Sequence, residues 1–183
     1  MFGCETELNK DLTLGISKEK LGLFDFIIIP TTHFHMKGFT LTDEEAKDTS
    51  SRAKAWIKRL DHVLGMDLPF QKTGLAHLTC SLIAPTREEY LEVIGLLPDE
   101  ELERLFTKAA ELGVGIELNG DDMNFPSEEE DIILRPYKIA KKCGCKFYLG
   151  SDIHGHKKFA KIKPIFEKAI DLLGLTEDDK FRI

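Results

Sequence analysis

Short apolar runs alternate with longer amphipathic segments along this chain. Five runs have the length and the branched or aromatic content of buried strands, and they cover residues 2–8, 24–30, 73–79, 114–119 and 146–150. The run 24–30, FDFIIIP, is apolar almost throughout, which is typical of a strand buried in a parallel sheet. The alternation predicts an α/β protein whose strands pair in sequence order, with helices outside the sheet.

The segments between these runs carry helix signals. Thr42 and Glu45 have the spacing of a capping box, so we expect a helix from Thr42 to about Leu64. Further helices are expected at 86–97, 98–112, about 127–143 and 157–173.

Length and composition limit the classes of function. The 183 residues favour a single domain, 1–183, and the 42% hydrophobic and 31% charged content is ordinary for a globular protein. A net charge of -7 disfavours a nucleic-acid partner, because phosphate backbones require clustered Lys and Arg. We see no signal peptide and no apolar run long enough to span a bilayer, so we expect a cytoplasmic protein without a membrane partner. The four cysteines show neither a C-x-x-C spacing nor a clear catalytic context.

Polar side chains collect where the predicted strands end. They are Glu5 or Glu7, His33 and His35, His77, Asn119, and the group Asp152, His154 and His156. The carboxyl ends of parallel strands meet at one edge, where imidazoles and carboxylates together favour a divalent metal centre of Zn, Mn or Fe. Water activated by such a metal makes hydrolysis the expected reaction class. Taken alone, Asp152 and His154 have an alternative interpretation, in which Asp152 caps the following helix and His154 is a surface loop residue.

The same stretches resemble, in order, the later motifs of the PHP (polymerase and histidinol phosphatase) family. These motifs are Gly3-Cys-Glu5, the strand 24–29 followed by Thr32-His33-Phe34, Ala76-His77, Gly115–Asn119 and Gly150-Ser-Asp-Ile-His154. The resemblance runs from residue 3 to about 156. It implies a distorted (β/α) barrel, incomplete here with about five parallel strands, and metal-dependent hydrolysis of a small phosphorylated substrate.

The resemblance also implies roles for individual residues. Glu5 resembles a bridging carboxylate, and His33 and His77 resemble the imidazoles that share one metal with it. Asp152 resembles a carboxylate ligand of a second metal and His154 a ligand of a third, so Glu5, Asp152 and His154 are the expected catalytic set. Residues expected near the substrate are Asn119, His35 and His156, of which His35 is also the rival of His33 as a ligand.

The chain departs from the family pattern at its start. The opening H-x-H strand of the family, and the following strand that ends in an acid and a histidine, have no counterpart here, as in a chain truncated at its N-terminus. Only the site of Glu5, His33 and His77 would keep all its ligands, so we expect about one tightly bound ion and poor catalysis. The alternative is a catalytically impaired PHP-like protein that binds metal or a partner. Open sheet edges favour a homo-oligomer.

Overall fold

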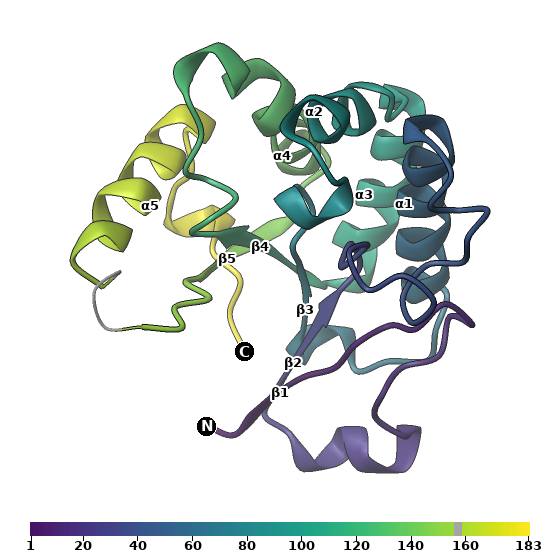
Figure 1. The fold of residues 1–183 in the computed structure, drawn as a ribbon. Helices are drawn as coiled ribbons and strands as arrows, with labels where there is room; N and C mark the ends of the chain where they lie inside the picture. Colours follow the sequence, from purple (N-terminus) through teal and green to yellow (C-terminus); the bar gives the residue numbers. More distant parts are fainter. Residues whose placement is uncertain (156–158) are drawn as a thin grey trace.

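Five parallel strands form one sheet in the computed structural model, which describes residues 1–155 and 159–183. The strands are β1 (Gly3–Glu5), β2 (Phe26–Pro30), β3 (Thr73–Ala76), β4 (Gly115–Asn119) and β5 (Lys146–Gly150). Each strand pairs with the next one in sequence, which confirms the predicted α/β class, the parallel strands and their order. The sheet is open, with β1 at one edge and β5 at the other (Figure 1).

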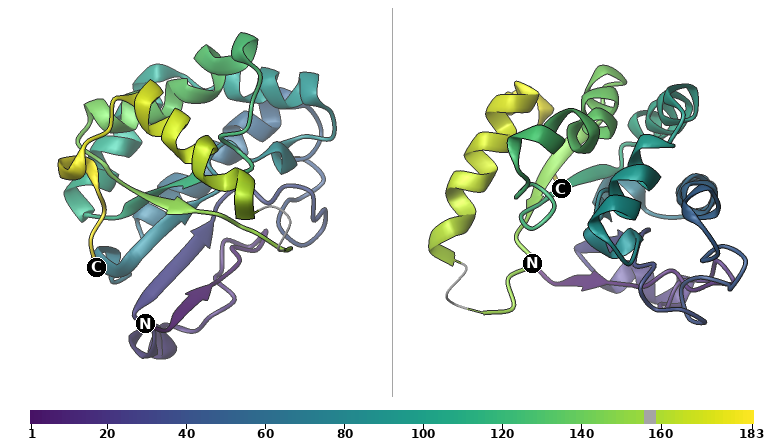
Figure 2. Two further views of the ribbon diagram at one scale, coloured as in Figure 1. Left: turned by 90° about the vertical axis from the view of Figure 1, so that its left-hand side faces the viewer. Right: turned by 45° about the horizontal axis from the view of Figure 1, so that its top comes forward.

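Helices follow the strands and gather on one side of the sheet (Figures 1 and 2). The α-helices are α1 (Thr49–Leu64), α2 (Arg87–Gly95), α3 (Asp99–Leu112), α4 (Glu130–Lys142) and α5 (Phe159–Leu173). Short 3-10 helices lie at Lys18–Leu23, Phe70–Lys72, Ser81–Ile83, Ser127–Glu129 and Glu177–Asp179. Within the described ranges, no helix has the length and apolar character needed to cross a bilayer.

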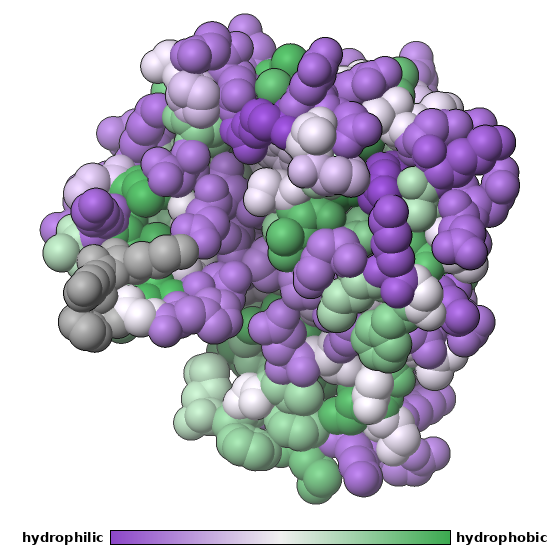
Figure 3. All heavy atoms as spheres, in the orientation of Figure 1, coloured by the Kyte–Doolittle hydropathy of each residue, from purple (hydrophilic) through white to green (hydrophobic). Residues whose placement is uncertain are grey.

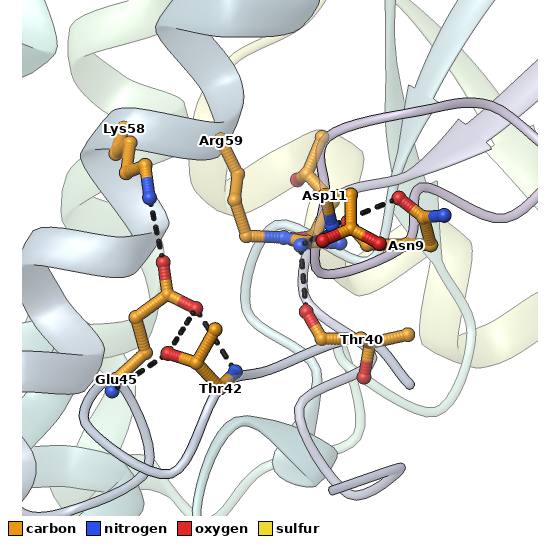
Figure 4. Close-up of polar contacts among 8 residues, drawn as sticks. Asn9, Asp11, Thr40, Thr42, Glu45, Lys58 and Arg59 are labelled. Atoms are coloured by element: carbon orange, nitrogen blue, oxygen red, sulfur yellow. Dashed lines mark hydrogen bonds and ion pairs between the residues drawn. The ribbon is translucent and has the colours of Figure 1, made fainter. Parts of the chain in front are cut away.

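The start of α1 differs from the prediction. The capping box between Thr42 and Glu45 does form, since the Glu45 N–H donates to Thr42 Oγ1 at 3.2 Å and the Thr42 N–H donates to Glu45 Oε2 at 3.1 Å. It closes only a turn, and the helix begins at Thr49, where the Asp48 carboxylate accepts from the Ser51 N–H at 2.7 Å. Glu45 also pairs with Lys58 at 2.9 Å, which ties the turn to the side of α1 (Figure 4). A prediction that the helix begins at Thr42 was therefore wrong, because a second N-cap follows the first.

The two faces of the sheet have different partners. Ile27, Ile29, Leu75, Ile116 and Leu118 have no exposed surface and belong to the core shared with the helices. The strand registers place the intervening residues on the other face, where neighbouring parallel partners point the same way. That second face therefore carries both acidic residues of the strands, Glu5 at the end of β1 and Glu117 in the middle of β4.

The second face is filled by aromatic rings at the amino ends of its strands. A Cβ at Gly74 would lie 2.5 Å from the Tyr148 ring, so this glycine leaves the space in which Tyr148 meets Phe26 edge-on at 5.2 Å. The C-terminal tail returns to β5, where the Phe181 N–H donates to the Phe147 carbonyl at 2.8 Å. The Phe181 ring lies over Gly115 and near the rings of Phe26 and Tyr148. Since this packing covers the amino ends, the carboxyl ends remain available for polar residues.

Candidate metal centre

Glu5, His33 and His77 come together at the carboxyl ends of β1, β2 and β3. One ligand atom from each lies within 4.8 Å of the others, and the two imidazole rings have centroids 4.7 Å apart. Glu5 ends β1, and His33 and His77 lie in the loops after β2 and β3. One carboxylate with two imidazoles is a donor set used for zinc, manganese and iron, so the residues fit a divalent ion.

The backbone at His77 is unusual and fixed from two sides. Its φ of 60° lies in the left-handed region, which turns the chain sharply at the end of β3. The Thr32 hydroxyl donates to the His77 carbonyl, and the His77 N–H donates to Glu117 Oε2 at 3.0 Å. These contacts join the loop after β2 to Glu117 in the middle of β4 through the main chain of His77, and they hold its ring in the cluster.

Glu7 orients the imidazole of His33. The ring nitrogen Nδ1 lies 2.8 Å from Glu7 Oε2, which leaves Nε2 for a metal. Burial lowers the pKa of His33, but the hydrogen bond and the charge of Glu7, together with the charges of Glu5 and Asp152, raise the net pKa above its ordinary value. The sequence left Glu5 and Glu7 open as alternatives. In the structure Glu5 belongs to the donor group and Glu7 supports it.

A buried arginine on α1 holds the loops that carry these residues. Arg59 has no exposed surface, and its guanidinium donates to the carbonyl oxygens of Leu8 and Asn9 after β1 at 2.6 and 3.2 Å. It also donates to the carbonyls of Thr31 and Thr40 in the loop after β2, both at 2.8 Å. Figure 4 shows the side chain reaching from the helix between the two loops. Arg59 thereby fixes the segments around Glu7 and His33 relative to one another.

Asp152 and His154 lie beside the cluster but outside its donor group. Asp152 has a φ of 46°, and His154 is 85% exposed with Nδ1 3.6 Å from Asp152 Oδ1. Both charges act on Glu5, whose pKa is raised mainly by burial and further by Asp152. Neither belongs to the set of donors that lie within 4.8 Å of one another, so the structure brings together three of the five expected ligands.

The residues expected near the substrate have three different environments. Asn119 is 1% exposed, and its side chain contacts Glu117 Oε2 and the Asp121 N–H, so it organises the turn after β4. His35 is exposed, with its ring 5.6 Å from that of His33, which places it at the rim of the cluster. His156 lies outside the described residues.

Sequence analysis missed three buried groups near His77, which are Glu117, Cys80 and Asp122. Burial raises the pKa of Glu117 to about 7; hydrogen bonds from the His77 N–H and Asn119 oppose this, and the charges of Glu5 and Asp152 add to it. The signal for Glu117 was an acid in the apolar run Gly115–Asn119, on the same face as Asn119. The signal for Cys80 was its place three residues after His77.

Neither the protein-family models nor the curated proteins contain a match to this chain.

Proposed function

We propose that this chain is a metal-dependent hydrolase of the phosphoesterase type, built on an incomplete PHP-like (β/α) barrel. The observation that carries the proposal is the convergence of Glu5, His33 and His77 at the carboxyl ends of three neighbouring parallel strands. Active sites of open α/β sheets and barrels lie at this end. The expected cofactor is a divalent ion of Zn, Mn or Fe, and the expected substrate is a small phosphorylated molecule.

The residues of the site would have two kinds of role, metal binding and proton transfer. Glu5, His33 and His77 would hold the ion, and Glu7 keeps Nε2 of His33 directed to it. When bound, a divalent ion supplies Lewis-acid activation of water and of a phosphoryl group. Asp152 and His154 are exposed beside the cluster, where His154 can donate a proton to a leaving oxygen and Asp152 can orient the imidazole.

The alternative is a catalytically impaired member that binds a metal or a partner. It is favoured by the number of donors, because phosphoester hydrolysis commonly uses two ions and this donor group has three protein ligands for one. In this case Glu5, His33 and His77 would form a structural or recognition site.

Metal content and hydrolysis, measured together, separate these functions. The purified chain would be loaded with Mn²⁺ or Zn²⁺, analysed for bound metal and assayed with p-nitrophenyl phosphate and bis(p-nitrophenyl) phosphate. We expect about one tightly bound ion and slow turnover in the wild-type chain, and loss of the turnover in Glu5→Gln and His33→Ala. His62→Ala is the matched control, since the His62 ring on α1 contacts the Leu12 carbonyl.

Each result has a distinct meaning. Metal-dependent turnover that requires Glu5 and His33 supports the hydrolase. Metal binding without turnover supports the impaired member. A wild-type chain that binds no divalent ion contradicts both functions, and turnover lost equally in His62→Ala contradicts the hydrolase.

A further inference from the structure

A second group of metal-ligating side chains lies on the buried side of His77. One donor atom each from His77, Cys80 and Asp122 lies within 4.8 Å of the others. Cys80 is in the turn after β3 and Asp122 in the turn after β4, and the three residues are 6%, 6% and 8% exposed. This group shares only His77 with the group formed by Glu5, His33 and His77.

Two atoms of this buried group have no hydrogen-bond partner. Among the described residues, nothing pairs with Nδ1 of His77 or Oδ2 of Asp122, although both atoms are inaccessible to solvent. An unpaired buried polar atom costs about 1–3 kcal/mol, so two of them in one cluster indicate a shared partner. The nearby hydroxyls of Thr79 and Tyr137 pair with each other at 3.0 Å.

We propose that His77, Cys80 and Asp122 form an inner binding site for a divalent metal ion of the zinc type. Imidazole nitrogen, thiolate sulfur and carboxylate oxygen are together the ligands of zinc and cobalt, whereas magnesium and calcium prefer oxygen alone. The ion would satisfy both unpaired atoms at once. Its two positive charges would also balance a thiolate and a carboxylate, which are costly to bury as free anions.

The inner site competes with the outer site of Glu5, His33 and His77. A neutral imidazole has one nitrogen lone pair available for a metal, because its other nitrogen carries the proton. An ion that takes His77 in the inner site therefore deprives the outer site of a ligand. Removal of an outer ligand other than His77 should shift metal to the inner site. This inference needs no hydrolytic activity, so it stands or falls separately from the proposed hydrolase.

Cobalt spectroscopy tests the inner site. Thiolate bound to Co²⁺ gives a ligand-to-metal charge-transfer band in the near ultraviolet, which imidazole and carboxylate ligands do not give. We expect this band when Co²⁺ is added to the metal-free chain, and a stronger band in Glu5→Gln. The band should disappear in Cys80→Ser and weaken in Asp122→Asn.

Cys145→Ser is the matched control. Cys145 is 1% exposed, and its thiol donates to the Phe106 carbonyl at 3.2 Å, so its loss should leave the band unchanged. In the Glu5→Gln background, loss of Cys80 should weaken Zn²⁺ binding by more than the about 10- to 100-fold that an outer hydrogen-bond partner contributes.

Wild type and Glu5→Gln keep all three inner ligands, so together they decide the question even if Cys80→Ser or Asp122→Asn folds poorly. If neither wild type nor Glu5→Gln shows the band, water rather than metal fills the cluster and the inner site is overturned. A band that survives in Cys80→Ser arises from another thiol and overturns it as well.

Discussion

At the scale of single residues, Glu117 lies beneath the histidines of the outer site. It is 4% exposed, and its Oε2 accepts hydrogen bonds from the His77 N–H and from Asn119. A Cβ at Gly150 would lie 1.8 Å from Glu117 Oε1, so the glycine that ends β5 provides the room for this carboxyl group. A buried acid so close to three proposed ligands connects the protonation of the site with the stability of the metal-free fold.

The first prediction concerns this connection. Burial raises the pKa of Glu117 from 4.5 to about 7, so the folded metal-free chain binds its proton more tightly than the unfolded chain does. The stabilisation that the protonated Glu117 gives to the folded chain is fully present below about pH 4.5 and is lost as the pH rises through about 7. The glutamine introduced by Glu117→Gln does not titrate, so this variant should not lose the stabilisation. As the pH rises between these limits, its free energy of unfolding relative to wild type should increase by up to about 3 kcal/mol. Urea unfolding in chelator measures the gain. Glu111→Gln, on the exposed end of α3, should show none, and a pH-independent difference in Glu117→Gln would contradict the prediction.

The second prediction concerns Glu7. Glu7→Gln removes the charge that raises the pKa of His33 and weakens the orientation of its ring. The pKa of His33, followed by NMR of the metal-free chain, should fall. Zn²⁺ affinity should fall about 10- to 100-fold, as for other carboxylate partners of metal-binding histidines. The exposed Glu44 provides a control as Glu44→Gln. Unchanged affinity in Glu7→Gln would show that Glu7 does not position a ligand.

At the scale of elements, the outer site depends on the hydrogen bonds from α1 to the loops after β1 and β2. Arg59 satisfies four carbonyl oxygens from those loops. The shape of its guanidinium matters here, because its N–H groups point in several fixed directions and a lysine ammonium cannot reach all four carbonyls. Arg52 on the same helix is also buried, but it donates to the carbonyls of Ala46 and Ile83.

The third prediction compares these two arginines. Arg59→Lys should lower the free energy of unfolding by about 3 kcal/mol or more, because it leaves several buried carbonyls unpaired. It should also weaken metal binding, since the segments of Glu7 and His33 lose their common anchor. Arg52→Lys should lower stability by about 1–2 kcal/mol and leave metal affinity unchanged. Equal effects of the two variants on metal affinity would contradict a positioning role for Arg59.

Most of the elements, but not all of their boundaries, could be predicted from the sequence. Apolar runs predicted all five strands and their order, because a buried parallel strand has a continuous apolar sequence. Strand ends predicted a polar cluster that included Glu5 or Glu7, His33, His35 and His77, and within it the structure groups Glu5, His33 and His77. The start of α1 was missed because both Thr42 and Asp48 can cap a helix, and tertiary contacts select between them.

Burial explains what could not be predicted at the site. Glu117 and Asp122 appear in sequence as ordinary acids, and Cys80 as an isolated thiol. Glu117 reaches the His77 N–H from the middle of β4, and the turns after β3 and β4 bring Cys80 and Asp122 close to His77. Arg59 was absent from the prediction for a similar reason, since an arginine in an amphipathic helix is usually solvated.

At the scale of the whole molecule, the helices gather on one side of the open sheet, and the surface has a hollow. In Figure 3 the face is hollowed between the β1 edge and the segment that follows β5, and apolar side chains gather below it. Met1, Phe2 and Leu23 contribute exposed apolar surface near the β1 edge. The C-terminal tail closes the amino ends of the strands, so this packing and the candidate metal centre lie at opposite ends of the same face.

The fourth prediction uses this separation. Phe181→Ala removes a half-buried ring from Gly115, Phe26 and Tyr148, and it should lower the free energy of unfolding by about 1–2 kcal/mol. Zn²⁺ affinity should not change, because the ring lies at the amino end of β4. Ile183→Ala, at a 58% exposed position of the same tail, should have little effect on either quantity. A large loss of Zn²⁺ affinity in Phe181→Ala would show that the two ends are coupled.

The pairing of each strand with its successor has a consequence for the order of folding. Because each strand pairs with its successor, a pair can form without waiting for strands that lie further along the chain. Glu5, His33 and His77 all come from the first three strands, so the outer site can assemble before β5 and α5 have docked. Metal present during folding would then stabilise an early intermediate as well as the native state. Pulsed hydrogen exchange should show β1–β3 amides protected ahead of β5, and earlier with Zn²⁺ than without it; simultaneous protection would exclude this order.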